Sequence, residues 1–362
     1  MRICFIAPAN NYHTKKWCKY FVQRRHEVHV ISFEDAIIDS VRVHAIDNNV
    51  NIKGGDFGKL LYLLMAKRIR NLVEEIKPDV VSVHYASSYG SAVAISGVKG
   101  YALSVWGSDV YEFPKKSIFH RVLLRYSLKS AKYLLSTSEA MAREAGKYTK
   151  KEILVTPFGV DMQLFSPQKR SREENDHEFI VGTVKALNPK YGIDNLIKAV
   201  AIVRKNNPVM PIKLRISGTG VSEKNLKDLA EKVGISDITT WLGFVSQEKA
   251  AIEWANMDVA VVCSREESFG VSAVEAQACC VPVIISGIPG LREATDPGHS
   301  SVIVAVDDEE ALAQAIEELY RKDDVRRLMG AAGLKYVREN YEWKKCFEKI
   351  ENIFESIKEN NT

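Results

Sequence analysis

The sequence predicts an α/β protein with two Rossmann-like domains, and three observations support this fold class. The chain has 362 residues, which is enough for two such domains. Apolar runs of strand length alternate with helical stretches, and this pattern restarts after a polar stretch in the middle of the chain. Some of these runs, such as Val259 to Cys263 and Val281 to Ile285, are rich in β-branched residues, which is typical of strands buried in a parallel sheet.

The polar stretch from Ser166 to His177 divides the chain. It is charged and has no apolar periodicity, so it is interpreted as a linker. This predicts a first domain over residues 1–165 and a second over residues 166–342. The second half then restarts with a strand from Phe179 to Val184 and a helix from Asp194 to Lys205.

The composition is that of an ordinary globular protein, with 46% hydrophobic and 27% charged residues. No run approaches the ~20 apolar residues of a membrane span. The N-terminal residues lead directly into a strand, so we expect a cytoplasmic protein without a signal peptide. The cysteines lack the spacing of a metal site, and we expect reduced thiols. They are Cys4, Cys18, Cys263, Cys279, Cys280 and Cys346.

The net charge of +4 is unevenly distributed. Through Phe165 there are 24 basic and 15 acidic residues, a net charge of +9, whereas the remainder carries −5. Such asymmetry indicates an anionic partner for the first half. No nucleic-acid motif is present, so an anionic membrane surface or a phosphorylated lipid is the better candidate. The helical stretch from Lys115 to Leu135 mixes apolar and basic residues. Its basic side is a candidate surface for anionic lipid, together with the basic residues near the N-terminus, which are Lys15, Lys16, Lys19, Arg24 and Arg25. Core packing is the alternative explanation for the apolar positions of this stretch.

Polar residues follow the first strand, which runs from Arg2 to Pro8. Open α/β sheets bind ligands at the carboxyl ends of their strands, so Asn11 and His13 are candidate contacts for an acceptor. A helix-capping role would explain Asn11 equally well. His84 ends a later strand, from Val80 to His84, and is either an active-site residue or a hydrogen-bonded structural histidine.

Two lysines follow the first strand of the second half. Lys185 and Lys190 lie five residues apart in a loop, where they can neutralise a diphosphate without a metal. Solvated surface lysines are the alternative. Further along, Gly218-Thr219-Gly220 is by itself evidence only for a tight turn.

The stretch from Met257 to Pro289 reads as strand, loop, helix and strand. Glu267 lies in the loop and Glu275 lies eight residues later in the helix, which corresponds to a rise of roughly 12 Å. Two carboxylates so far apart do not act on one bond, but they can hold opposite ends of an elongated ligand. The free N–H groups of the helix start suit an anion between them, and Gly270 permits close approach. This pattern fits a sugar nucleotide; an ordinary loop and a solvated Glu275 are the alternative.

The segment from Glu267 to Glu275 resembles the E-x7-E motif of glycosyltransferase family 4, the retaining enzymes with the GT-B fold. The resemblance covers nearly the whole chain and implies two Rossmann-like domains facing a cleft. It implies that Glu267 contacts the donor sugar and Glu275 the ribose. Backbone amides of Phe269, Gly270 and Val271 would face the diphosphate, and backbone at Val245 would hold the base.

Other segments carry the same resemblance. Residues 157–161 and 287–290 are similar to family segments, and the helix over residues 343–362 is expected to pack back on the first domain. Trp106 stands where many relatives have a histidine, so no catalytic histidine is transferred to it. Asp109 matches the family and would orient the acceptor or a neighbouring group; a helix N-cap is its alternative role. Lys185 replaces the usual arginine, which keeps the charge but loses the bidentate fork.

The resemblance implies retaining transfer of a sugar from a nucleotide sugar, with a UDP-sugar favoured over a GDP-sugar. The basic first half favours a lipid-linked or cell-envelope glycan as the acceptor, with a soluble acceptor as the alternative, and we expect peripheral membrane contact and no nucleic acid. Glu267, Lys185 and Lys190, with Asp109 and His84, are the catalytic candidates; Asn11, His13, Trp106 and Asp109 form the acceptor side. No metal motif is evident, so no cofactor or metal is expected. The alternatives are a non-hydrolysing nucleotide-sugar epimerase and an inactive sugar-nucleotide-binding subunit.

Overall fold

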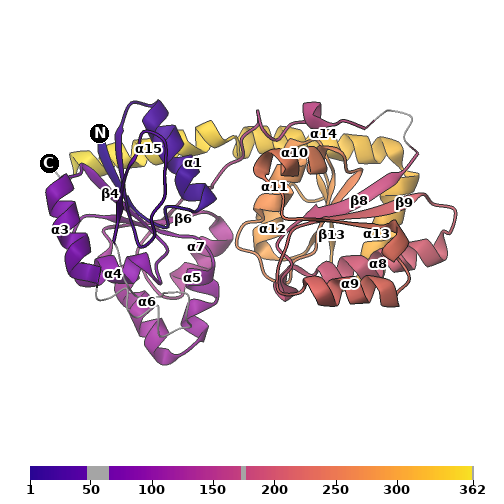
Figure 1. Cartoon of the computed structure of the whole chain (residues 1–362), viewed down its shortest axis with the longest axis horizontal. Helices are drawn as coiled ribbons and strands as arrows, with labels where there is room; N and C mark the ends of the chain where they lie inside the picture. Colours follow the sequence, from indigo (N-terminus) through magenta and orange to yellow (C-terminus); the bar gives the residue numbers. More distant parts are fainter. Residues whose placement is uncertain (47–64, 173–176, 361–362) are drawn as a thin grey trace. The chain divides into compact units, whose positions relative to one another are not determined.

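The computed structural model describes residues 1–46, 65–172 and 177–360 (Figure 1). The chain forms two compact units, one of Met1–Phe158 with Lys344–Thr362 and one of Gly159–Trp343. Both units consist of a parallel sheet with helices, so the predicted fold class is confirmed for each of them.

The sheet of the first unit has the order β3-β2-β1-β4-β5-β6-β7 in the described residues, and all its neighbouring strands are parallel. Strand order reverses between β1 and β4, which pair directly although β2 and β3 lie between them in the chain. The strands are β1 (Arg2–Ile6), β2 (Glu27–Ser32), β3 (Arg42–Ala45), β4 (Val80–His84), β5 (Ala102–Val105), β6 (Tyr133–Ser136) and β7 (Ile153–Val155).

Several helices of the first unit begin at polar residues whose side chains cap them. The side chains of Asn11 and Ser138, for example, accept hydrogen bonds from the first-turn backbone N–H groups of His13 and Met141. The helices are α1 (Tyr12–Gln23), α3 (Ala66–Ile76), α4 (Tyr89–Ser96), α5 (Ser108–Tyr111), η2 (Phe113–Lys115), α6 (Ile118–Ser130), α7 (Glu139–Gly146) and the C-terminal α15 (Trp343–Glu359).

The second unit repeats the same plan. Its sheet has the order β10-β9-β8-β11-β12-β13 in the described residues, and strand order reverses between the adjacent β8 and β11. The strands are β8 (Phe179–Val184), β9 (Ile212–Ser217), β10 (Thr239–Gly243), β11 (Val259–Val262), β12 (Val283–Ser286) and β13 (Ser301–Val304). The helices are η3 (Pro167–Lys169), η4 (Pro189–Tyr191), α8 (Ile193–Asn206), α9 (Glu223–Lys232), η5 (Ser236–Ile238), α10 (Gln247–Ala255), α11 (Val271–Ala278), α12 (Pro289–Glu293), α13 (Glu309–Arg321) and α14 (Asp323–Asn340).

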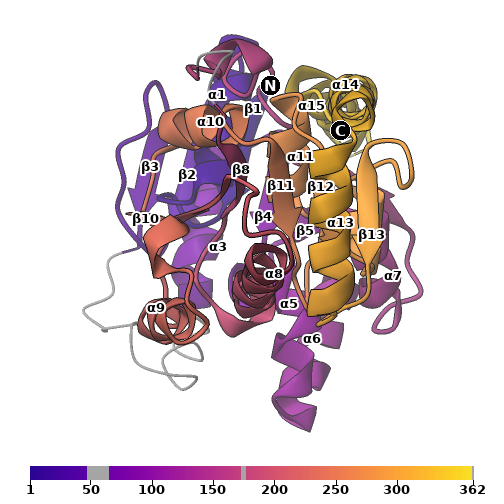
Figure 2. The same cartoon turned by 90° about the vertical axis from the view of Figure 1, so that its right-hand side faces the viewer.

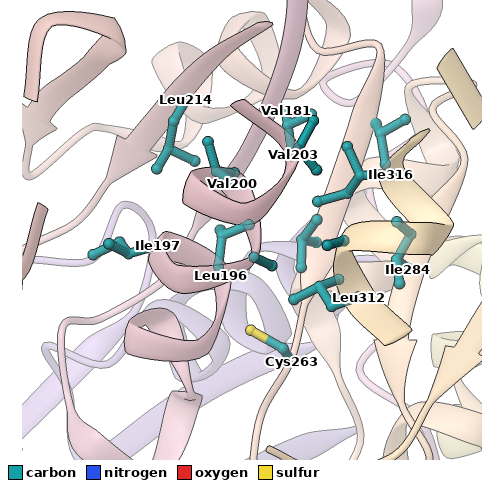
Figure 3. Packing of buried hydrophobic residues seen from close by; sticks show 14 of the residues in the cluster. Val181, Leu196, Ile197, Val200, Val203, Leu214, Cys263, Ile284, Leu312 and Ile316 are labelled. Atoms are coloured by element: carbon teal, nitrogen blue, oxygen red, sulfur yellow. The ribbon is translucent and has the colours of Figure 1, made fainter. Parts of the chain in front are cut away.

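Apolar side chains from both faces of this second sheet are fully buried. On one face, Leu196 and Val200 of α8 meet Val181 of β8 and Leu312 and Ile316 of α13 (Figure 3). On the other face, α10, α11 and the end of α14 pack over the sheet. Because both faces are covered, the strands carry the continuous apolar sequences from which they were predicted.

The domain boundary predicted after residue 165 is wrong by a short segment, because the chain divides after Phe158. Val160 and Phe165 are buried in the core of the second unit, beside Trp254 of α10. The backbone N–H of Val160 also donates to the carbonyl of Tyr341 at 2.7 Å. The residues before the polar linker therefore already belong to the second unit.

Helix α15 completes the first unit, at the opposite end of the chain from α1. Its Phe354 stacks on Phe21 of α1 with ring centroids 5.3 Å apart. Its Glu351 is buried and accepts hydrogen bonds from Tyr20 at 2.9 Å and Arg24 at 3.1 Å, and its other oxygen lies 2.7 Å from His26. The predicted packing of the C-terminal helix on the first domain is therefore what the structure shows.

Candidate active site

In the second unit, the lysine loop and the loop containing Glu267 lie at the same edge of the sheet. The first follows β8 and the second follows β11, the two adjacent strands at which strand order reverses. In open α/β sheets, this position outside the carboxyl ends of the strands is where ligands bind. Residues far apart in the sequence are thereby brought together.

Lys185 and Glu267 form an ion pair in this position. The Nζ atom of Lys185 lies 2.5 Å from Oε2 of Glu267, and both side chains are largely buried. The same Nζ lies 3.5 Å from the hydroxyl of Ser272 and 4.5 Å from the ring centroid of Tyr191. The hydroxyl of Ser264 donates to Glu267 at 3.5 Å. The carboxylate therefore has a fixed orientation at the sheet edge.

The Gly218-Thr219-Gly220 segment, which the sequence analysis treated only as a turn, holds the lysine loop in place. The N–H of Lys185 donates to Ser217 and the N–H of Leu187 donates to Thr219, both at 2.9 Å. A Cβ atom at Gly220 would lie 2.2 Å from the carbonyl oxygen of Leu187, so the second glycine is required sterically. Two glycines directly after a strand at the ligand-binding edge were the signal that could have predicted this role.

Arg265 also supports the lysine loop, a role that no sequence pattern indicated. Its guanidinium forms a bidentate ion pair with Asp194, at 2.9 and 2.7 Å, and a second pair with Asp307 at 2.8 Å. Its backbone N–H donates to the carbonyl oxygen of Lys190 at 2.8 Å. Burial raises the pKa of Asp194, but the bonds from Arg265 outweigh it, and the pKa is lowered overall. Arg265 thus fastens the Lys190 segment to the loop that carries Glu267.

Helix α11 begins beside Glu267, as predicted. Gly270 has φ +86° and precedes Val271, the first helical residue, while Phe269 is buried against Tyr341 at a centroid distance of 5.0 Å. A Cβ atom at Gly290 would lie 2.5 Å from the carbonyl oxygen of Glu267. The family-like segment at residues 287–290 therefore packs directly on the Glu267 loop.

Glu275 is buried, which excludes the solvated alternative considered for it. The indole Nε1 of Trp254 donates to its carboxylate at 3.4 Å. Val245, the predicted base contact, is also buried and follows Gly243 at the end of β10. The N–H of Gly218 donates to the carbonyl of Gly243 at 2.7 Å, so the β9 and β10 ends are joined at the same sheet edge.

In the first unit, the predicted acceptor-side residues lie at the corresponding position, where β1 and β4 are adjacent. Asn11 caps α1 by accepting from the N–H of His13 at 2.8 Å, so the capping alternative is what the structure shows. The ring of His13 stacks on Phe158 with a centroid distance of 3.8 Å and lies 5.9 Å from the ring of Trp106. Burial and the charge of Lys16 lower the pKa of His13 to about 3.

His84 is fully buried beneath these residues. Its ring lies 4.4 Å from that of Trp106, 4.7 Å from Trp17 and 5.5 Å from Phe5. Neither ring nitrogen has a hydrogen-bond partner among the residues that the structure describes, and burial, together with the charge of His13, lowers the pKa of His84 to about 3. His84 is therefore a neutral histidine of the core. It lacks the hydrogen bonds that the structural alternative predicted for it.

Asp109 is also fully buried and connects two loops. It accepts hydrogen bonds from the N–H groups of Ala86 at 2.9 Å, Trp106 at 3.1 Å and Gly107 at 2.8 Å. Burial raises its pKa, while these hydrogen bonds oppose that effect. Asp109 thus fixes the loops after β4 and β5, and its oxygens face backbone donors. Trp106 is held by a 3.0 Å hydrogen bond from its Nε1 to Ser104.

Three further sequence expectations concern groups outside this site. The six cysteines are all unpaired, and five of them are buried. Within residues 1–46, 65–172 and 177–360, no group of three or more His, Cys, Asp or Glu side chains is arranged to hold a metal ion. Among the helices of the described chain, none combines the length and apolar content needed to cross a membrane.

The two parallel α/β units fit the GT-B fold that the sequence resemblance implies. Comparison with known proteins agrees. Residues 165–336 match the family described as Glycosyl transferases group 1, and residues 2–138 match Glycosyl transferase 4-like. The chain belongs to the GT-B glycosyltransferases of family 4.

The relatives differ in name and in coverage. An uncharacterized glycosyltransferase of Methanocaldococcus jannaschii is 25% identical, over 91% of this chain and 90% of its own length. A D-inositol 3-phosphate glycosyltransferase of Pseudarthrobacter chlorophenolicus is 32% identical, over 78% of this chain and 74% of its own. Others with that name match over about half of their own length. HepE of Anabaena, solved with UDP and glucose, has the same fold, with a TM-score of 0.81, 18% identity and coverage of 98% and 100% of the two chains.

Proposed function

We propose that this glycosyltransferase moves a sugar from a nucleotide sugar, with a UDP-sugar favoured, to an acceptor hydroxyl with retention at the anomeric carbon. The observation that carries the proposal is the Lys185–Glu267 pair at the strand switch point of the second unit. A cation and an acceptor-only carboxylate in one place match the diphosphate and the hydroxyl-rich sugar of such a donor. The solved HepE complexes with UDP and with UDP-glucose support this choice of donor.

Binding of the donor would break the ion pair between Lys185 and Glu267. Lys185 would exchange Glu267 for the diphosphate, and Lys190, on the loop held by Arg265, would approach the same group. Glu267 would then accept hydrogen bonds from sugar hydroxyls. The N–H groups at the start of α11 (Phe269 to Val271) add partial positive charge to this position. Glu275 would hold the ribose and the backbone at Val245 the base.

In the proposed reaction, the acceptor hydroxyl attacks the anomeric carbon on the face from which the diphosphate departs. The bond from the anomeric carbon to the diphosphate oxygen breaks, the new glycosidic bond forms, and the departing diphosphate takes the acceptor proton. The protein positions the reactants and stabilises the charge on the leaving group. The two lysines supply positive charge for the leaving group, so the proposal includes no metal.

The acceptor would bind to the first unit, at the edge formed by Asn11, His13 and Trp106. Asp109 would act there as a positioning residue, because its oxygens are occupied by backbone N–H groups of the two loops. The net charge of +9 through Phe165 favours an anionic acceptor, for which a lipid-linked or cell-envelope glycan is proposed. A soluble phosphorylated acceptor is the alternative, and both kinds of acceptor are to be compared in the turnover assay.

The donor assignment is tested by calorimetric titration of the protein with a panel of UDP- and GDP-sugars in the presence of a metal chelator. Micromolar binding of one nucleotide, weakened by Lys190→Ala, is expected. The matched control is Lys205→Ala, which removes an exposed lysine at the far end of α8. Absence of binding to every member of the panel would refute the donor site as described.

A turnover assay separates the proposal from its alternatives. The protein is incubated with the donor and with extracts that contain candidate acceptors. Nuclear magnetic resonance should show that the transferred sugar in the product keeps the anomeric configuration that it had in the donor. Glu267→Ala should abolish this product while the protein stays folded, with a lower unfolding temperature because Lys185 loses its ion-pair partner. Interconversion of the donor sugar without an acceptor would indicate an epimerase. Donor binding without any turnover would favour an inactive binding subunit.

A further inference from the structure

Helix α6 presents apolar side chains to solvent on one side. Its inner side is buried through Leu124, Ser127 and Leu128. Its outer side carries Ile118, Phe119, Val122 and Tyr126, which are 78%, 54%, 56% and 46% exposed. Residues 118, 122 and 126 are four apart, so they form one continuous stripe along the helix. We call these four side chains the apolar stripe.

A basic stripe runs beside the apolar stripe. Arg121, Arg125 and Lys129 are also four residues apart, and all three are exposed. None of them forms a salt bridge with any residue in the described parts of the chain. From residue 113 to residue 138 the sequence contains six Lys or Arg and no Asp or Glu. The exposed surface of α6 therefore combines apolar contact with uncompensated positive charge.

The other basic helix predicted to contact a membrane, α1, is less suited to it. The Nζ atom of Lys16 donates to the carbonyl of Phe158 at 3.2 Å. Arg24 is paired with Glu351 of α15. Lys16 of α1 and Arg24, which follows its last residue, thus have partners inside the first unit, whereas the basic stripe of α6 is exposed.

The position of α6 also links it to the proposed acceptor edge. β5 ends at Val105, and the chain then passes through Trp106, α5 and η2 before α6 begins at Ile118. Figures 1 and 2 both show α6 at the lower end of the first unit, beyond the other helices. The exposed first turn of α6 is therefore connected to the Trp106 loop by two short helices.

We infer that α6 is a membrane-docking helix that binds an anionic lipid surface, with the apolar stripe inserted between headgroups and the basic stripe on lipid phosphates. An interfacial helix needs this combination of an apolar side and adjacent cations. The inference deepens the proposed function, because it places the acceptor edge of the first unit near lipid-linked substrates. It does not depend on the identity of the donor.

The test is co-sedimentation of the full chain with vesicles of phosphatidylcholine containing phosphatidylglycerol, compared with phosphatidylcholine alone. We expect binding to the anionic vesicles only, and weaker binding at high salt. Phe119→Ser with Val122→Ser should remove most of it. Arg121→Gln, Arg125→Gln and Lys129→Gln together should weaken it roughly a hundredfold, at about fivefold per charge.

Matched controls remove the same chemistry elsewhere. Val209→Ser with Leu328→Ser removes two exposed apolar side chains of the second unit, and Lys205→Gln, Lys224→Gln and Lys232→Gln together remove three exposed charges. Both control proteins should bind vesicles like the parent protein. Absence of vesicle binding by the parent, or binding unaffected by the α6 substitutions, would overturn the inference.

Two measurements separate this outcome from others. Donor titration of the α6 variants should give the parent affinity, so failure of vesicle binding and failure of the donor assignment are distinguishable. Light scattering reports oligomeric state. If the apolar-stripe substitutions dissociate an oligomer while the parent binds no vesicles, the stripe contacts a second copy of the chain and the membrane inference is wrong.

Discussion

A Cβ atom at Gly218 would lie 1.9 Å from the carbonyl oxygen of Lys185, so these two loops meet at a distance that only glycine permits. Gly218 also has φ +141°, a conformation that residues with a side chain rarely adopt. The position of the Lys185 loop therefore depends on a residue that follows another strand.

Gly218→Ala should displace the Lys185 loop and weaken donor binding, and its backbone strain alone should cost about 1–3 kcal/mol of folding free energy. Calorimetric titration and denaturant unfolding measure the two effects. The matched control is Gly234→Ala, where φ is +75° but no atom lies within 4 Å of the added Cβ. The control should lose stability but keep donor affinity; equal loss of affinity in both would contradict the role given to Gly218.

Lys185→Met should weaken donor binding roughly ten- to hundredfold, because a charge-assisted contact to the diphosphate is lost. It also leaves Glu267 without its ion-pair partner. Lys185→Arg keeps the charge and should retain most of the affinity. Donor titration of both variants measures this difference, and similar affinities for Met and Arg would show that Lys185 does not meet the diphosphate.

His84→Phe should preserve turnover at neutral pH and reduce the acid sensitivity of folding. The pKa of His84 in the folded protein is about 3, whereas the unfolded chain binds this proton near pH 6.5. Because the unfolded state then holds one more proton, stability decreases as pH falls from about 6.5 towards 3, by about 1.4 kcal/mol per unit. The substitution removes this contribution, while that of His13, whose pKa is also about 3, stays.

Denaturant unfolding at several pH values measures the slope, with His299→Gln, an exposed histidine, as the matched control. A slope reduced equally in both variants would contradict the assignment to His84. Loss of turnover in His84→Phe with unchanged folding would instead show that His84 takes part in the reaction.

Glu351→Gln should destabilise the first unit by about 1–3 kcal/mol at neutral pH, because a buried charged acceptor is lost. Burial raises the pKa of Glu351. The interactions with His26, Tyr20 and Arg24 lower it by more than burial raises it, so the pKa lies below its ordinary value. Its stabilising contribution is therefore present above the unfolded-state pKa of about 4.3 and is lost as pH falls through the folded-state pKa. Thermal unfolding should show a gap between parent and variant that closes in acid. The exposed Glu348→Gln on the same helix should behave like the parent at every pH.

The sequence was sufficient for features that repeat along the chain. Buried parallel strands are apolar throughout, and this pattern predicted two α/β units and the strand–loop–helix around Glu267. Contacts between separate loops leave no such pattern. The packing of Gly218 on Lys185 and the bridge from Arg265 to Asp194 join segments distant in the chain, and both escaped prediction.

Burial of individual side chains was equally hard to predict. Phe165 lies directly before a polar stretch, and its burial in the same apolar cluster as Trp254 places it in the second unit. His84 and Asp109 end or follow strands, where ligand contacts are usual, but the structure encloses both. A strand end determines where a residue lies along the sheet; the neighbouring aromatic rings and loops determine whether solvent reaches it.

The placement of α15 has a consequence for biosynthesis. The ribosome releases the first unit's sheet early, but the helix that covers Trp17 and Phe21 of α1 is made only after the whole of the second unit. During translation, the apolar side of α1 is not yet covered by Phe354 while residues 159–343 emerge and fold. The nascent first unit therefore leaves this apolar surface uncovered until α15 emerges, and a chain truncated directly after residue 343 yields a finished second unit attached to an unfinished first one.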